Sequence, residues 1–556
     1  MISVDYKIVS SLEKVFLSPR FEGAAIKRLS ALRGERVHFQ IALSSSESAG
    51  VKIIPAAPEG FAGKITVREV QNIPSLMPGA PEDDWVLRSE PGLYPDALSP
   101  IRQELATAAH CWHAAWVTVD LPADAPAGDF LLKFKLQFIS HATLPSFCPE
   151  PEVEKEEAIT LTVIPACLPE QVLKVTHWFY ADCIQHHYQV RSWSEEHWQL
   201  LEKYFRNYAE HHNNLLRTPL WSVPLDRVPG LTSRPVCQLL EISHKNDVWH
   251  FDFSRLERWI STAQKCGIKN FEIVHAFSQW GLKWAPEIIV DGMPMFGKDT
   301  PLDAPEYTDF LRTLMKEMIP VLQKHGLTPE NCYFHISDEP HGDEALQRYR
   351  YAAGLFRELL QGYPYIDALS DIQFFRQGVI DRPIPYIGKL DEFVQENTAE
   401  RWVYFAGSWE NGLPGRHFSM PSLRNRILGI LLYIYDCKGF LHWGYNFWFG
   451  QFSRTWDVDP WVDSNSDRSF RSGGAFLVYP GPEGPVDSLR HEVFSEGLQD
   501  EMALRLLESK TSREEVLHWL DEEAGYRMTM QKYPREDLWL LALREKLNRK
   551  LAAIMH

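Results

Sequence analysis

The sequence predicts a multidomain β plus α/β protein: an N-terminal β-sandwich, a (β/α)8 TIM-like barrel and a C-terminal helical extension. Three observations support this fold class. Short apolar runs separated by Pro, Gly, Ser and Asp fill the first 167 residues. From about residue 172, strand-like runs alternate with amphipathic helical stretches, and beyond residue 484 the pattern is helical. The predicted domains therefore span residues 1–167, 172–484 and 485–556.

The predicted sandwich consists of short strands bounded by turn-forming residues. The clearest apolar runs are residues 36–43, 63–70, 113–122, 128–138 and 158–165. Several short strands with turn signals between them are typical of a β-sandwich. The acidic, proline-containing segment 147–158 is expected to be a loop before the last strand, and Pro165 and Pro169 mark the end of the domain.

The predicted barrel consists of strands and helices in alternation. Candidate strands are residues 174–182, 214–221, 270–277, 331–337, 367–372, 384–388, 401–408 and 438–448. Helical periodicity is seen in residues 195–212, 306–326 and 343–362, and in the C-terminal region in residues 488–509. Eight strands alternating with helices is the pattern of a (β/α)8 barrel.

Composition and charge exclude several classes of protein. The 556 residues carry 57 Lys and Arg against 74 Asp and Glu, a net charge of −17. Such an acidic surface repels nucleic acid and anionic lipid, so neither is an expected partner. The longest apolar run, residues 427–435, is about half of a spanning helix. Asp5 and Glu13 stand where a signal peptide has its apolar core, so a cytoplasmic location is expected.

The eight cysteines are scattered. No two are closer than 16 positions, so there is no CxxC pair and no zinc-finger spacing. They are expected to be reduced thiols.

An Asp-Glu pair follows the fourth predicted barrel strand. In the run HISDEP, residues 335–340, Asp338 and Glu339 stand at the strand exit and Pro340 ends the strand. Barrel enzymes carry their catalytic groups at the carboxyl ends of strands. The same dipeptide at 343–344, 391–392, 500–501 and 521–522 does not follow a buried strand. Asp338 and Glu339 are therefore the catalytic candidates, and the competing interpretation is an Asp that caps the next helix.

Aromatic and amide side chains crowd the end of the eighth predicted strand. The run GFLHWGYNFW, residues 439–448, places Trp443, Tyr445, Asn446 and Trp448 together. Aromatic faces and amides of this kind bind sugars, while ordinary barrel core is the alternative. His177 and Tyr180, on the first predicted strand, form a similar but weaker group.

Other motifs give little support to other chemistries. The pairs 186–187 and 211–212 are adjacent histidines, which lack the i, i+4 spacing of a helical metal pair. The glycines of residues 473–484 form neither a phosphate-binding nor a dinucleotide-binding loop, and there is no GxSxG nucleophile elbow.

Several motifs together resemble glycoside hydrolase family 123 and the related domain-of-unknown-function group 4091. They are HISDEP at 335–340, GFLHWGYNFW at 439–448 and the run at 473–500, with RGERVHFQ (33–40), YPDALSP (94–100) and residues 115–130 also similar. The resemblance covers nearly the whole chain in the expected order. It implies a β-sandwich followed by a barrel, and a retaining β-N-acetylgalactosaminidase.

The resemblance also implies a role for each carboxylate. In a substrate-assisted reaction the 2-acetamido oxygen of the sugar attacks the anomeric carbon and forms an oxazolinium-like intermediate. Glu339 is then expected to protonate the leaving oxygen and to deprotonate water. Asp338 is expected to accept the acetamide N–H and to stabilise developing positive charge. Because adjacent strand residues point to opposite faces, the pair converges only where the chain leaves the strand.

Two alternatives stay open at this point. One is a glycosidase for a sugar without an acetamido group, with Asp371 or Glu410 as the second carboxylate. The other is a carbohydrate-binding protein without activity. In the main hypothesis the partner is an oligosaccharide or glycoconjugate substrate, and no metal or organic cofactor is expected.

Overall fold

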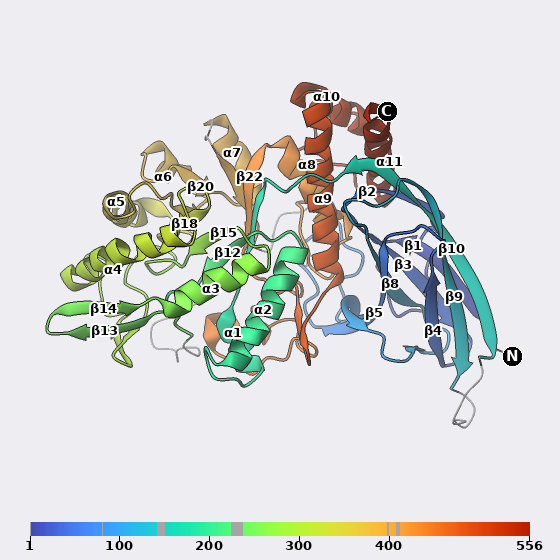
Figure 1. Ribbon diagram of the computed structural model, residues 1–556, viewed down its shortest axis with the longest axis horizontal. Coiled ribbons are helices and arrows are strands. Elements are labelled where there is room, and N and C mark those ends of the chain that lie inside the picture. The colour runs from blue at the N-terminus through green and yellow to red at the C-terminus, as the bar shows by residue number, and fades with distance from the viewer. Residues whose placement is uncertain are drawn as a thin grey trace.

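The computed structural model describes residues 2–555 except 81, 142–150, 224–236, 397, 399 and 407–411. Two sheet-rich parts lie side by side, and a bundle of C-terminal helices sits between and above them (Figure 1). Among the described residues, no helix is both long and apolar enough to cross a membrane. The seven cysteines in the described part form no disulfide with one another, and Cys148 lies outside it.

The N-terminal part consists of two packed sheets of five described strands each. The first has the order β1 (Val4–Ser10), β3 (Arg36–Ser45), β8 (His113–Asp120), β5 (Lys64–Ser75), β6 (Gly92–Pro100). The second has the order β2 (Arg28–Arg33), β10 (Val153–Cys167), β9 (Gly128–Ser140), β4 (Ala49–Ala56), β7 (Leu105–Thr107). Alternate residues of β9, among them Leu132, Phe134 and Leu136, face the core, as period-2 patterning requires.

The loop expected at 147–158 is partly a strand. β10 begins at Val153, and Glu154 and Glu156 pair across the sheet with Lys135 and Lys133. The charges that suggested a loop are cross-strand partners on the solvent face. The remainder of that segment, up to residue 150, lies outside the described residues.

The middle of the chain supplies parallel strands that alternate with helices. The strands are β11 (Lys174–His177), β12 (Leu215–Thr218), β15 (Asn270–Ile273), β18 (Cys332–Phe334), β19 (Ile366–Ala368), β20 (Arg382–Ile384), β21 (Arg401–Tyr404) and β22 (Cys437–His442). The described helices are α1 (Ala181–His187), α2 (Glu195–Glu210), α3 (Ser254–Lys265), α4 (Pro305–Lys324), α5 (Gly342–Leu359), α6 (Ile372–Arg376), α7 (Leu390–Gln395) and α8 (Leu423–Ile434), with 3-10 turns η1 (Ile387–Lys389) and η2 (Gln451–Ser453).

These strands form short parallel sheets rather than one uninterrupted ladder. The pairings are β11–β22–β21, β12–β15–β18 and β19–β20. Isolated parallel bridges, Phe334 to Tyr365 and Tyr386 to Tyr404, link them further. The observed strands are shorter than predicted, because the residues after them leave the sheet to form the loops of its carboxyl edge. A closed eight-stranded barrel stays a prediction.

Three hairpins were not predicted. They are β13 (Glu241–Lys245) with β14 (Val248–Asp252), β16 (Ile288–Val290) with β17 (Met293–Phe296), and β23 (Tyr479–Gly481) with β24 (Gly484–Val486). The first projects from the end of the molecule remote from the sandwich (Figure 1).

The C-terminal helices are α9 (Leu489–Lys510), α10 (Arg513–Ala524) and α11 (Asp537–Ile554). α9 packs on α8 at a glycine contact, where a Cβ on Gly429 would lie 1.7 Å from the carbonyl oxygen of Gly497. α9 also joins the sandwich: Glu496 accepts a 2.7 Å hydrogen bond from the Ser11 hydroxyl, and Gln499 accepts one from the Arg36 backbone N–H. The two sheet-rich parts are thereby held in a fixed relation.

Candidate active site

A cavity of about 210 Å³ opens at the carboxyl ends of the parallel strands. Its lining comes from residues at, or after, the carboxyl ends of β11, β15, β18, β19, β21 and β22. They are Trp178, Tyr180, Gln279, Trp280, Asp338, Glu339, Ala368, Tyr404, Ala406, Leu441, Trp443, Phe447, Gln451 and Phe470. Two adjacent carboxylates therefore stand in a cavity walled largely by aromatic rings.

The chain leaves the sheet before it reaches the two carboxylates. β18 ends at Phe334, and Glu339 has a φ of +47°, in the left-handed region that side chains other than glycine rarely adopt. The backbone is held there by the Glu339 N–H, which donates to the Ala368 carbonyl at 2.9 Å. This local strain lets neighbouring side chains face the same cavity, as the sequence analysis required.

Glu339 is half-buried and is held by two side chains. The Tyr404 hydroxyl donates to Glu339 Oε1 at 2.6 Å, and the Trp280 Nε1–H approaches Oε2 at 3.3 Å. Each carboxylate oxygen thus has one donor from the protein. The carboxylate is oriented while its remaining lone pairs face the cavity.

Asp338 is almost fully buried, 7% exposed. Its pKa is raised well above the ordinary value of 3.8, first because burial penalises the charged form and then because the charges of Glu339 and Asp367 repel it. Its carboxylate makes no hydrogen bond to any residue that the structure describes. It is therefore a buried acceptor at the cavity wall, suited to an N–H of a bound molecule.

A buried polar network supports the strand that carries the pair. His335 lies between Glu272, 2.7 Å away, and Asp367, 3.3 Å away. Although burial lowers the pKa of His335, its two carboxylate neighbours raise it overall to about 9. Asp367 also accepts hydrogen bonds from the backbone N–H groups of Ile336 and Ser337. This fixes the residues just before Asp338.

The structure brings two of the six predicted sugar-binding residues to the cavity. Trp443 lines it and donates from Nε1 to the Ala406 carbonyl at 3.1 Å. Tyr180 lines it too, its ring under the Arg217 guanidinium at 4.4 Å, and its hydroxyl donates to the Trp443 carbonyl.

The other four are buried against the protein and do not line that cavity. Asn446 bonds the backbone N–H and carbonyl of Tyr180 and so positions the neighbouring ring. His177 Nδ1 lies 2.7 Å from Asn213 Oδ1. The Tyr445 hydroxyl donates to Asn207 Oδ1, and Trp448 Nε1 donates to the Val478 carbonyl.

Sequence reasoning missed Trp280 and Tyr404. Trp280 is 50% exposed and lies in the loop after β15, and Tyr404 is the last residue of β21. The rule that strand ends carry function applies to both. Within aromatic runs such as RWVYF (401–405), however, the pattern does not distinguish the tyrosine that meets a carboxylate from those in the core.

The two alternative carboxylates do not join the described lining. Asp371 caps α6, accepting from the Gln373 N–H at 3.1 Å, and it also accepts from the Gly342 N–H. Its oxygens serve backbone donors. Glu410 lies outside the described residues.

Two groups of side chains have atoms close enough to share a metal ion: His275, His335 and Asp367, and also His211, Asp487 and His491. In the first group both ring nitrogens of His335 already face carboxylates, and hydrogen bonding accounts for its position. In the second, His211 and His491 stack at 3.7 Å beside the Asp487 and Glu492 carboxylates. The expectation of a site without metal stays a prediction.

Comparison with known proteins places this geometry in a family. Residues 178–507 match the model of the glycoside hydrolase 123 catalytic domain. A solved family 123 glycoside hydrolase from Clostridium perfringens superposes with a TM-score of 0.72 at 13% identity, covering 99% of this chain and 98% of that one. The fold of sheets and helices is therefore similar over the full length.

Two other solved structures are less similar. A β-glucuronidase from Bifidobacterium dentium has a TM-score of 0.31 at 11% identity, covering 90% of this chain and 67% of that one. One from Dictyoglomus thermophilum has a TM-score of 0.33 at 8% identity, covering 88% and 73%. TM-scores this low carry no inference about this chain.

No curated protein matches this sequence. The catalytic-domain model alone, however, covers more than half of the 556 residues, including both carboxylates and the aromatic cavity walls. The chain is therefore a glycosidase and belongs to glycoside hydrolase family 123.

Proposed function

We propose that the protein releases terminal β-linked N-acetylgalactosamine by a retaining, substrate-assisted mechanism. The observation that carries the proposal is the carboxylate pair: Asp338 and Glu339 are the two carboxylates among the described residues that line the cavity. Both come from one strand end. A two-carboxylate glycosidase needs its carboxylates on either side of the scissile bond, whereas a substrate-assisted one takes its nucleophile from the sugar.

Glu339 acts as the general acid and then as the general base. Its carboxyl protonates the glycosidic oxygen while the acetamido oxygen attacks the anomeric carbon, and the leaving alcohol departs. It then takes a proton from the water that opens the oxazolinium ring, which restores the acetamide and retains the anomeric configuration. The hydrogen bonds from Tyr404 and Trp280 hold the carboxylate for both steps.

Asp338 acts on the acetamido group. Its buried oxygens accept the acetamide N–H, which turns the amide oxygen toward the anomeric carbon and stabilises the positive charge that spreads over the amide. The absence of a hydrogen-bond partner among the described residues leaves these oxygens available. The Trp443, Trp280 and Tyr180 rings offer apolar faces for the sugar.

We also propose which glycans are the substrates and how the parallel strands are arranged. The similar Clostridium perfringens enzyme is described as hydrolysing glycolipid glycans, and we infer glycans bearing terminal N-acetylgalactosamine, including those of glycolipids, as substrates here. We also infer that the eight parallel strands close into a (β/α)8 barrel. The barrel then lies between a sandwich domain of residues 1–167 and a helical region of residues 485–556. The parallel bridges between the sheets support the closure.

Hydrolysis of aryl β-glycosides tests the proposal. Wild-type protein should cleave aryl β-N-acetylgalactosaminide fastest, β-N-acetylglucosaminide more slowly and β-galactoside at background rate. Cleavage of the β-galactoside as fast as the acetamido sugars would contradict the proposal, because the nucleophile would then have to come from the protein.

Tyr404→Phe should lower kcat about 10–100-fold, since a hydrogen bond to a charged group contributes about 1.5–3 kcal/mol. The phenol holds Glu339 Oε1 at 2.6 Å, so its loss frees the carboxylate to rotate. The matched control is Tyr365→Phe, which removes a buried hydroxyl that donates to the Val379 carbonyl and contacts Arg357. Equal losses in both variants would mean that Tyr404 acts through stability alone.

A further inference from the structure

A second cavity, of about 250 Å³, adjoins the catalytic one. The two share Ala406, Trp443 and Phe470. The remaining lining residues are Met77, Ala80, His417, Arg468, Ser469, Arg471 and Gly474. Met77 and Ala80 follow β5 of the sandwich, so the N-terminal part contributes one wall. The Trp443 and Phe470 rings, whose centroids are 4.8 Å apart, form a wall that the two cavities share.

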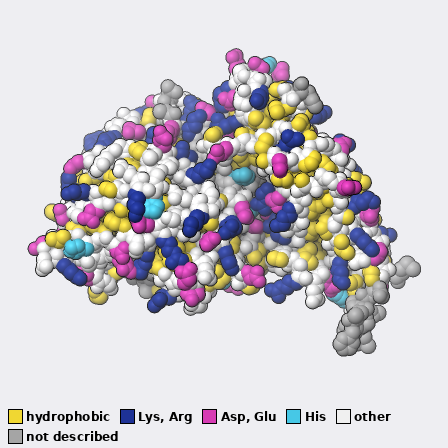
Figure 2. Space-filling view, in the orientation of Figure 1, with side chains coloured by type: hydrophobic (Ala, Val, Ile, Leu, Met, Phe, Trp, Pro, Cys, Tyr) yellow, Lys and Arg dark blue, Asp and Glu magenta, His cyan; other side chains and the backbone are white. Residues whose placement is uncertain are grey.

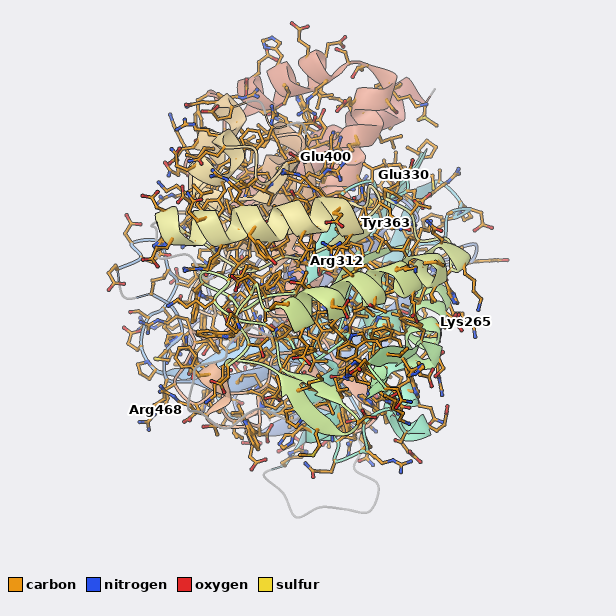
Figure 3. All side chains as sticks on the ribbon, turned by 90° about the vertical axis from the view of Figure 1, so that its left-hand side faces the viewer. Lys265, Arg312, Glu330, Tyr363, Glu400 and Arg468 are labelled. Atoms are coloured by element: carbon orange, nitrogen blue, oxygen red, sulfur yellow. The ribbon has the colours of Figure 1, made fainter. Side chains whose placement is uncertain are left out.

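Two cations of this cavity have no counterion among the described residues. The guanidinium groups of Arg468 and Arg471 make no ion pair and no hydrogen bond with any residue in the described ranges. Arg468 is exposed, and Figure 3 shows it at the edge of the molecule, with its side chain directed outward. Two buried arginines in this part of the fold differ: Arg490 pairs with Asp96 and Arg424 with Asp83.

The nearest carboxylates in the sequence serve other donors. Asp467 Oδ2 accepts from the Thr455 hydroxyl at 2.5 Å. Asp463 accepts from the backbone N–H groups of Asn465 and Asp467. The described lining of the cavity includes no carboxylate. His417 adds no charge, because burial and then the surrounding arginines lower its pKa to about 3.

Arg468 and Arg471 place two positive charges at one cavity of an acidic protein. The net charge is −17, and acidic and basic side chains are interspersed over the face drawn in Figure 2. The overall charge repels anionic glycans, so attraction must come from a local site. Guanidinium groups match the planar oxygens of a carboxylate and the oxygens of a sulfate with paired hydrogen bonds.

We propose that Arg468 and Arg471 form a subsite for an anionic group of the substrate glycan, next to the position where the terminal sugar is cleaved. The subsite rests on the proposed function for the identity of that sugar. Its chemistry is that of a sulfate ester or a carboxylate. The two sources are a sulfate on the terminal N-acetylgalactosamine and the carboxylate of a uronic acid on its reducing side.

Matched substrates test the subsite. Aryl β-N-acetylgalactosaminide is compared with its 6-sulfate and 4-sulfate, and N-acetylgalactosamine β-linked to glucuronate is compared with the same sugar linked to galactose. For the wild-type protein, kcat/KM on the anionic substrate divided by kcat/KM on the neutral one should exceed 1 in at least one pair. Addition of 0.5 M salt should reduce this ratio. Whichever pair shows the preference identifies the source of the anion.

The double variant Arg468→Gln, Arg471→Gln should lower that ratio about 10-fold or more, as the loss of hydrogen bonds to charged groups requires. The control Arg102→Gln changes an exposed arginine of the loop after β6, which likewise has no partner among the described residues, and it should keep the ratio. An equal effect of the double variant on anionic and neutral substrates would overturn the subsite, as would the absence of any preference in wild type.

Binding separates this result from a failure of the proposed function. Calorimetric titration of the Glu339→Gln variant with the same glycans measures affinity without turnover. Suppose that the wild-type protein cleaves no β-N-acetylgalactosaminide. The subsite is still supported if the Glu339→Gln variant binds the anionic glycan of a pair more tightly than the neutral one, and if the triple variant Glu339→Gln, Arg468→Gln, Arg471→Gln loses this preference. Equal affinity for the two members overturns it whatever the enzyme cleaves.

Discussion

Glu339→Gln should lower kcat by about 10²–10⁴-fold on substrates with a sugar or alkyl leaving group, the usual contribution of a general acid–base group. Glutamine keeps the volume and can still contact Tyr404 and Trp280, so folding and KM should change little. The loss should shrink on a dinitrophenyl glycoside, because that leaving group departs without a proton. Steady-state rates on both kinds of substrate measure the difference.

The matched control is Glu522→Gln in α10, the second residue of another Asp-Glu pair, which is exposed beside His518. It should leave both rates unchanged. A Glu339→Gln enzyme that retains wild-type kcat on the sugar leaving group would remove Glu339 from the mechanism.

Asp338→Asn should lower kcat about 10²–10³-fold, the usual loss when one stabilising group of the transition state is removed. The asparagine no longer offers a carboxylate to the acetamide N–H or to the developing positive charge. Rates on β-N-acetylgalactosaminide, measured across pH, test this role. A loss below about 3-fold would show that Asp338 does not contact the acetamide.

The raised pKa of Asp338 gives this prediction a pH dependence. The mechanism needs the ionised form, so the wild-type rate should fall on the acid side at a pH well above the ordinary 3.8 of an aspartic acid. The Asp338 carboxyl binds its proton more tightly in the folded protein than in the unfolded chain, so its ionisation lowers the free energy of unfolding. This loss of stability is present above the pKa of the folded protein and disappears as the pH falls through that pKa.

Asp338→Asn should consequently raise the free energy of unfolding at pH 7, by roughly 0.5–2 kcal/mol, the range of gains when a functional site is relaxed. Urea unfolding at pH 7 and at pH 4 measures it. A variant that is less stable at pH 7 would show that the carboxylate stabilises the fold.

Sequence patterns predicted the strands and helices well where apolar and polar residues recur with a regular period. They failed at a strand segment rich in charged residues. β9 and the helices α2, α4 and α5 are close to their predicted ranges, because one face of each is apolar, and α9, which is buried on all sides, is close to its range as well. The start of β10 was missed, since its alternating glutamates pair with lysines on the next strand, a partner that no local pattern contains.

The candidate site was predictable in its acids and partly in its walls. The strand-exit rule selects Asp338 and Glu339, and the structure brings both to the cavity. The GFLHWGYNFW run contributes Trp443 and Phe447, but Tyr445 and Trp448 turn into the core, where both contact Tyr204 of α2. Trp280, from a loop, and Tyr404, from the end of β21, join Glu339 from distant parts of the sequence, and only the three-dimensional arrangement reveals that.

The most direct measurement of the central claim is kcat for a series of aryl β-galactosaminides whose N-acetyl group carries zero, one, two or three fluorine atoms. Fluorine withdraws electrons from the amide oxygen and weakens it as a nucleophile without changing the leaving group. If that oxygen attacks the anomeric carbon, kcat falls progressively with each fluorine. A series with the same kcat throughout would contradict the account, because the nucleophile would then belong to the protein.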